Sequence, residues 1–471
     1  MLRATLTSAY AVGVGSRVVM QALALAQIMV ASRFIGLGEF GSYALAWACT
    51  AIFSSFVFTG YYQAFLSTRT ADEDRSTIFG VMLALATTGS LVLVVTGLVI
   101  GEKQRLVSQI FMALALLPMI EACYAWNEAH LLREKRVRTI SFIGTASETL
   151  ATAVLIAGLY YGLGAMALVA ARYAAVLVNV AASTAIVRRV PVPAFRRHVL
   201  HKGRATAITM WLSSGATMLA NYGIDLILGI FLNPSQVGAY RGGARISQTT
   251  ADLIQQPLTV LTWSRFSRLV AERHARVIGL AWRVNMSFGT IAAWPLMLCV
   301  GLLSKELVTV VLDETWLPTA GVITILCLVR AIRILTALLE PTFTNLNRQG
   351  LQLTLRMIGL AVTFFAVLAF GRTSAEAAAS AQVWASFLVA FGTLEFTRRV
   401  LRITPANLVR TFLPGLLLSG LCGAFVVASQ PMRDALPPAP GLFLTLGGLV
   451  IVWGGAVALA LWKRLIRLPT P

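Results

Sequence analysis

Apolar runs of about twenty residues recur along the whole chain, each bounded by a short polar or basic segment. A run of that length forms a helix that spans the hydrocarbon core of a bilayer. The first runs lie near residues 11–32, 41–65, 78–100, 107–128, 142–162 and 165–187. The later runs lie near residues 207–231, 238–262, 281–303, 318–339, 351–371, 376–396, 411–429 and 441–462. The pattern predicts an all-α polytopic membrane protein with about fourteen transmembrane helices.

One short segment occurs twice, each time directly after a long apolar run. Residues 34–43 read FIGLGEFGSY, and residues 231–240 read FLNPSQVGAY. If an even number of spans separates the copies, the two halves are parallel repeats related by an axis along the membrane normal. Many transporters are built from such repeats.

The repeat divides the chain into four predicted parts. We expect one six-helix bundle in residues 1–190 and a second in residues 207–400. Residues 401–471 add two further transmembrane helices. Residues 191–206 contain prolines and several basic side chains, which is typical of a linker, and we expect this linker to be cytoplasmic.

Composition agrees with a membrane protein. Hydrophobic residues make up 57% of the chain and charged residues only 12%. The net charge of +20 does not indicate nucleic-acid binding, because no stretch is long and polar enough to form a basic soluble domain. The five cysteines stand singly inside apolar runs, so we interpret them as small core residues.

The basic residues instead indicate orientation. With a cytoplasmic N-terminus, most Lys and Arg residues fall in cytoplasmic segments, which satisfies the positive-inside rule. The few on the opposite side are Arg33, Lys103, Arg105, Lys305, Arg372 and Arg433. We therefore predict a multi-pass membrane protein with both termini in the cytoplasm, where basic loops also contact anionic lipid.

An enzyme is not expected. The predicted outer loops are about a dozen residues at most, too short to carry a glycan-transfer site. The outer carboxylates Asp313 and Glu314 are adjacent, so their side chains diverge and do not form an acid/base pair. The four histidines lie at cytoplasmic ends or loops, and no nucleotide-binding motif occurs, so we predict no catalytic residues, metal site or cofactor.

Charged side chains inside the predicted spans are the best pointers to function. Each is costly at membrane depth, at least ~2.5 kcal/mol, and should be paired or face an aqueous cavity. They are Arg17, Glu121, Glu148, Arg172, Asp225, Arg241, Arg245, Asp252, Arg330, Arg333 and Arg356. Arginine predominates among them.

Two arginine pairs have helical spacing. Arg241 and Arg245 are four residues apart, and Arg330 and Arg333 are three apart, so each pair shares a helix face. Paired guanidinium groups bind phosphate or diphosphate with bidentate, permanently charged hydrogen bonds. The alternative is that these arginines neutralise buried carboxylates or extend to the membrane interface. For Arg172, Arg330 and Arg356 the two interpretations are equally open.

Single charges complete the candidate site. Arg17 has no acidic residue in its own predicted helix and ranks first among the candidates for a cavity. Asp225, Asp252 and Glu121 are candidates for binding a coupling ion or for ion pairs, and for the two aspartates we favour a salt bridge to Arg245.

Three stretches carry a resemblance to a known family. They are ASRFIG leading into EFGSY at residues 31–43, QPL at 256–258 running into SRFSRL at 264–269, and LDETWLPTA at 312–320. In this order and spacing the chain resembles the Wzx-type lipid-linked oligosaccharide and polysaccharide flippases of the multidrug/oligosaccharidyl-lipid/polysaccharide (MOP) exporter superfamily.

The resemblance implies two six-helix bundles in a V around a cationic cavity that opens alternately to each side. It also implies that the substrate is an oligosaccharide on a polyprenyl diphosphate, moved from the inner to the outer leaflet for exopolysaccharide, capsule or O-antigen assembly. Arg17, Arg241 and Arg245 would hold the diphosphate. Polysaccharide polymerase and a chain-length regulator would be partners. A peptidoglycan-precursor (lipid II) flippase is an alternative, and a MATE-like small-molecule antiporter is a further one, although it would favour acidic cavity residues.

Overall fold

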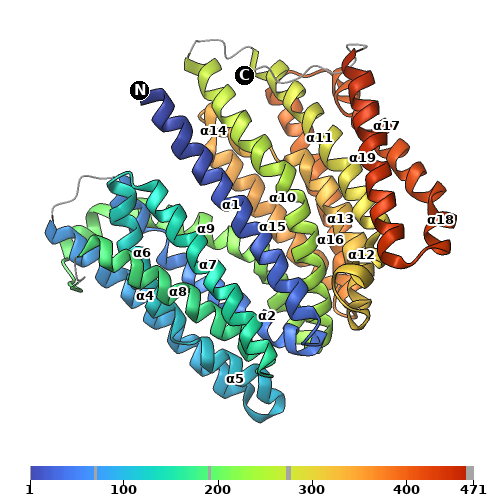
Figure 1. Cartoon of the computed structure of the whole chain (residues 1–471). Coiled ribbons are helices and arrows are strands. Elements are labelled where there is room, and N and C mark those ends of the chain that lie inside the picture. Colours follow the sequence, from blue (N-terminus) through green and yellow to red (C-terminus); the bar gives the residue numbers. More distant parts are fainter. Residues whose placement is uncertain (1, 68–71, 189–191, 272–276, 463–471) are drawn as a thin grey trace. The chain divides into compact units, whose positions relative to one another are not determined.

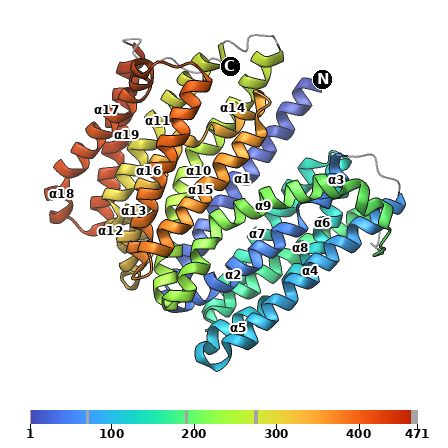
Figure 2. The same cartoon turned by 180° about the vertical axis from the view of Figure 1, so that it is seen from behind.

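The structure is a computed structural model that describes residues 2–67, 72–188, 192–271 and 277–462. Some side chains within these ranges, including that of Arg17, lie outside the described set. The described segments form helices and connecting turns and contain no β-strand. The predicted all-α fold is confirmed, and Figure 1 and Figure 2 show the long helices from the two sides.

Within the described ranges, twelve helices are long and apolar enough to cross a membrane. They coincide with twelve of the predicted spans. The other two predicted spans are helical as well. The first helix contributes an apolar part, Val19–Ser32, and the span near 238–262 is part of a 38-residue helix that Arg241, Arg245 and Asp252 make more polar. The chain is therefore a multi-pass membrane protein with the expected number of long helices.

The first compact unit comprises Met1–Gly238. Its helices are α1 (Leu2–Ser32), α2 (Leu37–Val57), α3 (Tyr61–Ser67), α4 (Asp72–Ile100), α5 (Arg105–Leu114), α6 (Leu117–Arg133), α7 (Val137–Tyr160), α8 (Met166–Val187) and α9 (Arg197–Phe231). Helix α7 packs between α1 and α8, and α6 packs on α8. Helix α9 follows the predicted linker and packs on α2, so the compact unit extends beyond residue 190.

The predicted linker is attached to the first unit. The backbone N–H of Ala194 donates to the carbonyl of Ser76 at 3.1 Å, and the N–H of Arg196 donates to Thr77 Oγ1 at 3.3 Å. The hydroxyl of Tyr61 donates to the carbonyl of Leu200 at 2.6 Å. These bonds hold the segment before α9 against the start of α4 and against α3.

The second compact unit comprises Ala239–Pro471. Its helices are α10 (Pro234–Ala271), which begins just before the unit, α11 (Ile278–Leu302), α12 (Ser304–Val311), α13 (Pro318–Arg333), α14 (Leu339–Asn345), α15 (Gln349–Phe370), α16 (Ala375–Val400), α17 (Pro405–Ala428), α18 (Gln430–Ala435) and α19 (Pro438–Trp462). Ser374 and Thr404 begin α16 and α17 as N-caps, accepting from the N–H groups of Ala377 at 3.0 Å and Asn407 at 3.4 Å.

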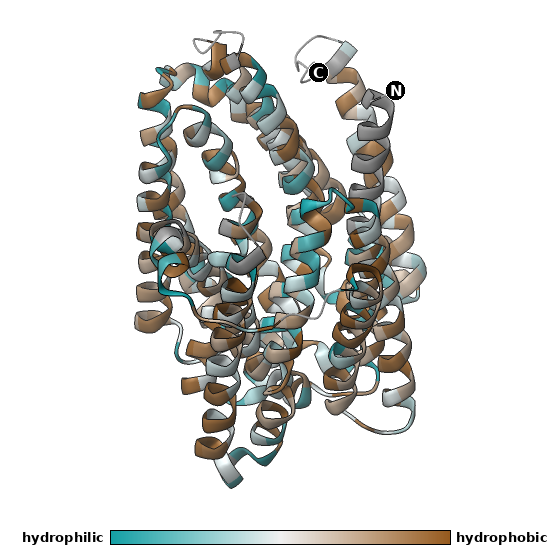
Figure 3. Ribbon diagram, turned by 90° about the vertical axis from the view of Figure 1, so that its left-hand side faces the viewer, coloured by the Kyte–Doolittle hydropathy of each residue, from teal (hydrophilic) through white to brown (hydrophobic). Residues whose placement is uncertain are grey.

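The two C-terminal helices are integral to this unit. Helix α17 packs along α11, and α19 packs on α17 and α12. A buried apolar cluster joins them and includes Cys299 and Cys422. These two cysteines and Cys327 are free and buried, which agrees with their interpretation as small core residues. Figure 3 shows hydrophobic residues along most of the helical ribbon, as expected for helices that meet lipid.

The two copies of the repeated segment touch each other at their glycines. A Cβ atom on Gly41 would lie 1.7 Å from the carbonyl oxygen of Pro234, and one on Gly238 would lie 2.1 Å from the carbonyl oxygen of Leu37. The contact is reciprocal, because Leu37 and Pro234 occupy equivalent positions in the two copies. Only glycine allows the two backbones to come this close.

Candidate functional site: an arginine cluster in the second unit

The candidate residues are divided between the two units. Arg241, Arg245 and Asp252 lie on α10, and Arg330 and Arg333 lie on α13, all in the second unit. Glu121 on α6 and Asp225 on α9 belong to the first unit, where Asp225 is buried. Arg17 lies on α1, and its side chain is outside the described residues.

Hydrogen bonds to neighbouring helices position the α13 arginines. Arg333 Nε donates to Ser386 Oγ of α16 at 3.2 Å. One turn earlier on α16, Gln382 Nε2 donates to the hydroxyl of Tyr240 at 2.8 Å. Tyr240 directly precedes Arg241. This bond therefore joins the start of α10 to α16, the helix whose Ser386 accepts from Arg333.

Arg330 is held differently. Its Nε is buried and has no hydrogen-bond acceptor among the described residues. A guanidinium carries five N–H donors and stays charged in proteins, so an unused buried donor is a costly feature. An anion that brings acceptor oxygens would satisfy it.

The arginines from α10 and α13 act on one another and on one aspartate. Arg330 interacts electrostatically with Asp252, Tyr240 and Arg241. Asp252 interacts with both Arg330 and Arg245, and Arg333 interacts with Arg330. Four guanidinium groups therefore gather on α10 and α13, and such a group offers many charged donors to an anion.

Two glycines bring α10 to α13. Between Arg241 and Arg245 lie Gly242 and Gly243. A Cβ atom on Gly242 would lie 3.1 Å from the buried ring of Trp316, and one on Gly243 would lie 2.8 Å from the Val322 side chain. The small residues allow close helix packing, which places the flanking arginines beside α13. Sequence reasoning did not identify this role, although the glycine pair between two arginines was a visible signal. It also missed Tyr240, Gln382 and Ser386, whose partners are distant in sequence.

The first unit contains an ion pair between α7 and α8. Arg172 of α8 lies 3.7 Å from Glu148 of α7, and Arg172 Nε donates to the hydroxyl of Tyr43 at 3.2 Å. The guanidinium also lies 4.6 Å from the ring centre of Trp47. The structure therefore favours the ion-pair interpretation of Arg172. In the described part of the chain, no group of three or more His, Cys, Asp or Glu side chains could hold a metal ion.

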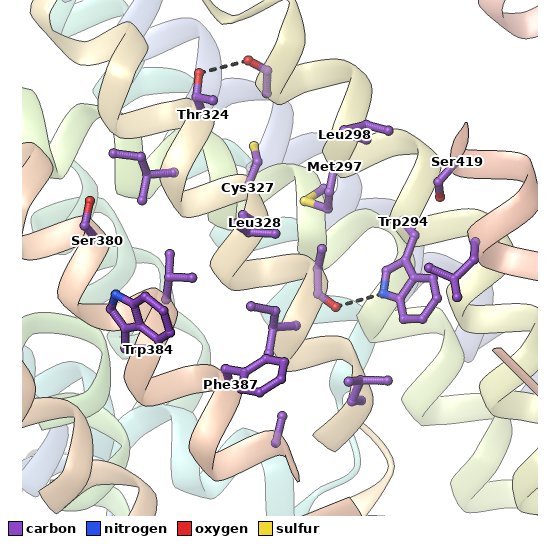
Figure 4. Close-up of a pocket in the computed structure, with 18 of the residues that line it drawn as sticks. Trp294, Met297, Leu298, Thr324, Cys327, Leu328, Ser380, Trp384, Phe387 and Ser419 are labelled. Atoms are coloured by element: carbon purple, nitrogen blue, oxygen red, sulfur yellow. Dashed lines mark hydrogen bonds between the residues drawn. The ribbon is translucent and has the colours of Figure 1, made fainter. Parts of the chain in front are cut away.

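An apolar pocket of about 780 Å³ lies among α11, α13, α16 and α17 (Figure 4). Met297, Leu328 and Phe387 are among its lining residues. One polar group at its wall, Trp294 Nε1, donates to the carbonyl of Ala331 at 2.8 Å. Such a pocket suits a hydrocarbon chain. Leu328 lies on the face of α13 opposite Arg330, so this helix has one apolar and one cationic face.

Comparison with known proteins agrees with this architecture. The profile of the polysaccharide biosynthesis protein family matches residues 30–321. Among curated proteins, no sequence matches the chain.

Solved structures of several membrane transport proteins have a similar fold. The lipid II flippase MurJ, in an inward closed conformation, superposes with a TM-score of 0.72 at 11% identity, covering 97% of this chain and 99% of that one. An inward-facing multidrug resistance MATE family transporter of the MOP superfamily gives 0.58 at 14% identity, covering 81% and 94%. A eukaryotic MATE transporter gives 0.55 at 14% identity, covering 88% and 98%. The chain belongs to the polysaccharide biosynthesis protein family and has the membrane fold of the MOP-superfamily flippases and transporters.

Proposed function

We propose that this protein is a flippase that moves a polyprenyl-diphosphate-linked oligosaccharide from the inner to the outer leaflet of the bacterial cytoplasmic membrane. It works by alternating access and makes or breaks no covalent bond. The glycan serves exopolysaccharide, capsule or O-antigen assembly, with a polymerase and a chain-length regulator as partners. Membership of a polysaccharide biosynthesis family and the fold of flippases support this proposal.

The observation that carries the proposal is the cluster of Arg241, Arg245, Arg330 and Arg333, in which Arg330 interacts with Arg241, Arg333 and Asp252. A diphosphate has several anionic oxygens, and guanidinium groups bind such oxygens in bidentate geometry. The unused Nε of Arg330 supplies a donor for one of them. Arg17, on α1, is proposed as a further substrate-binding residue. The apolar pocket shown in Figure 4 suits hydrocarbon, as expected for a protein that handles lipids.

The test is lipid translocation by the purified protein in vesicles. A fluorescent polyprenyl-diphosphate glycan is placed in both leaflets, and an impermeant reductant then bleaches the outer leaflet only. Active protein makes the protected fraction accessible, and Arg330→Ala slows this process. Arg348→Ala is the matched control, because Arg348 is exposed and lies outside the cluster. Translocation of the glycan lipid at the protein-free rate would contradict the proposal.

Arg17 and Arg245 are tested separately in cells. Deletion of the gene should leave lipid-linked repeat units accessible only from the cytoplasm. Complementation with Arg17→Ala or Arg245→Ala should restore export poorly. Unchanged export with either variant would remove that residue from the substrate site.

The likeness to MurJ, over nearly the full length of both chains, favours lipid II as a second candidate substrate. Both lipids carry a diphosphate, so the arginine cluster suits either. Parallel vesicle assays with lipid II and with a polyprenyl-diphosphate oligosaccharide distinguish them, because the physiological substrate should be moved faster at equal concentration.

A further inference from the structure

Helix α6 carries two acidic residues, Glu121 and Glu128, on one face of the first unit. They are seven residues apart, which is two helical turns, or about 10 Å along the axis. Helix α6 packs against α2, α3, α4, α7 and α8, so its carboxylates face the interior of the unit. Neither residue is part of the arginine cluster, which lies in the second unit.

Glu121 lacks a full set of partners. Its Oε2 is buried and has no hydrogen-bond donor among the described residues. Ser54 of α2 is the hydroxyl that acts on this carboxyl group, and the Ser54 hydroxyl is itself buried without a partner of good geometry. A buried carboxylate that remains ionised without partners is strongly disfavoured, and binding a proton removes the charge.

Glu128 has two donors. Its Oε2 accepts from the hydroxyl of Tyr62 on α3 at 3.1 Å, and its Oε1 accepts from the hydroxyl of Tyr124 at 3.4 Å. The pair of tyrosine hydroxyls can stabilise the ionised carboxylate and can also exchange protons with it. Glu128 is closer than Glu121 to the end of α6 at Arg133, which is the predicted cytoplasmic end.

The charged groups around α6 do not neutralise Glu121. Arg172 of α8 is the charged side chain that acts on it, but Arg172 already pairs with Glu148 of α7 and bonds Tyr43 of α2. At the far end of α6, Arg133 and Arg75 of α4 lie over the ring of Phe65, with guanidinium carbons 4.4 and 6.0 Å from its centre.

Further buried polar atoms lie along the same part of the unit. Gln63 Oε1, Trp126 Nε1 and Asn127 Oδ1 have no hydrogen-bond partner within the described ranges. Groups of this kind are normally satisfied by ordered water. A hydrated polar path between Glu128 and the predicted cytoplasmic side would allow proton exchange.

From this geometry we propose that Glu121 is a proton-binding site in the first unit, and that Glu128 with its two tyrosines passes the proton between Glu121 and the cytoplasmic end of α6. A solvent proton is bound by the carboxylate oxygen of Glu121, and no other bond changes. Metal cations need several oxygen ligands each, and the two carboxylates are too far apart to share one. A role in coupling rests on the proposed flippase function, whereas proton binding does not.

Infrared difference spectroscopy on the purified full chain in membranes tests proton binding directly. Changing the pH should reveal the C=O stretch of a protonated carboxylic acid that disappears in Glu121→Gln. In Glu121→Asp the band should persist at a shifted frequency. Glu134→Gln, an exposed residue outside the unit's interior, is the control and should leave the band unchanged. A spectrum in which Glu121→Gln loses no protonated-carboxyl signal would overturn the proposal.

A second measurement tests coupling. In vesicles that flip the glycan lipid, an imposed pH gradient should change the rate several-fold for the wild type and not for Glu121→Gln, while diphosphate binding is retained. A rate that follows a sodium gradient and ignores the pH gradient would overturn the proposal. If the Glu121 band is present but no lipid is flipped, proton binding stands and the flippase function fails.

Discussion

An arginine inside a membrane protein keeps its charge, so what its donors contact decides its role. Arg172 uses its donors on Tyr43 and Glu148, and its guanidinium packs on Trp47. Arg330 has a buried Nε without an acceptor in the described part of the chain. The first arrangement is a closed structural pair, and the second leaves a donor for a ligand.

Arg330→Ala should weaken binding of an isoprenyl diphosphate. Hydrogen bonds to charged groups contribute about 1.5–3 kcal/mol, so we expect a loss of about tenfold or more. Titration of the purified protein with farnesyl diphosphate, followed by calorimetry, measures the affinity. Arg330→Lys should recover the affinity only in part, because lysine cannot bind in bidentate fashion. Equal affinities for Arg330→Ala, Arg348→Ala and the wild type would show that Arg330 does not touch the diphosphate.

Helix pairs in this protein meet where small residues remove side-chain bulk. Helix α2 meets the start of α10 at Gly41 and Gly238, and α10 meets α13 at Gly242 and Gly243. Gly41 and Gly238 lie within the two copies of the repeated segment, and Gly242 and Gly243 lie between Arg241 and Arg245. Close helix contacts of this type therefore set the position of the functional side chains.

Gly41→Ala should destabilise the protein, because its Cβ would collide with the backbone of Pro234, which cannot rotate away. Overpacking of this kind costs about 1–3 kcal/mol. Loss of the monodisperse peak after heating in detergent measures the effect. Gly38→Ala lies three residues away with open space around its Cβ and should behave as the wild type. A Gly41→Ala protein as stable as Gly38→Ala would rule out the tight contact.

The short helices α12 and α18 are joined by a buried arginine. Arg433 Nε donates to Glu306 Oε1 at 3.1 Å, and Arg433 Nη1 donates to the Val426 carbonyl and to Ser429 Oγ, both at 2.7 Å. Arg433→Met removes these bonds and leaves the partly exposed Glu306 carboxylate without this partner, and the loss of a hydrogen bond to a charged group costs about 1.5–3 kcal/mol.

We expect a clear fall in thermal stability for Arg433→Met, measured by the same heating assay. Lys305→Met, which removes an exposed charge from the same helix as Glu306, is the control and should change stability little. If Arg433→Met and Lys305→Met lost the monodisperse peak at the same temperature, the Arg433–Glu306 pair would contribute nothing to thermal stability.

For the entire chain, the distribution of basic residues predicts which side each loop occupies. The loop at Glu134 is strongly basic and is expected in the cytoplasm, whereas the exposed Tyr161 lies in a loop without basic residues. The five native cysteines are free, three of them are buried and two are partly buried, so an impermeant thiol reagent should label them weakly.

Tyr161→Cys should react with that reagent in intact cells, and Glu134→Cys should react only after the inner membrane is opened. Labelling measured by gel shift reports both positions, and the unsubstituted protein gives the background. The reverse pattern would invert the predicted topology and place both termini outside the cytoplasm.

The sequence alone predicts the helical spans, which the structure confirms. It also predicts an orientation bias and two arginine pairs. These properties depend on residues that are near one another in the chain, and hydrophobic length, loop charge and helical spacing express them directly. The span predicted near residues 238–262 is helical in the structure, as part of α10. Its polar residues, including Arg241, Arg245 and Asp252, keep it below a simple hydropathy criterion for a membrane span.

Folding in three dimensions was needed to decide which charges meet. Arg172 and Glu148 form a pair across α7 and α8, Arg330 of α13 interacts with Arg241 and Asp252 of α10, and Glu121 is left with few partners. Each outcome depends on contacts between helices far apart in sequence, which are set by glycine packing and helix crossing. A linear pattern contains the charges, but it does not contain the neighbours that neutralise them or leave them free to bind a ligand.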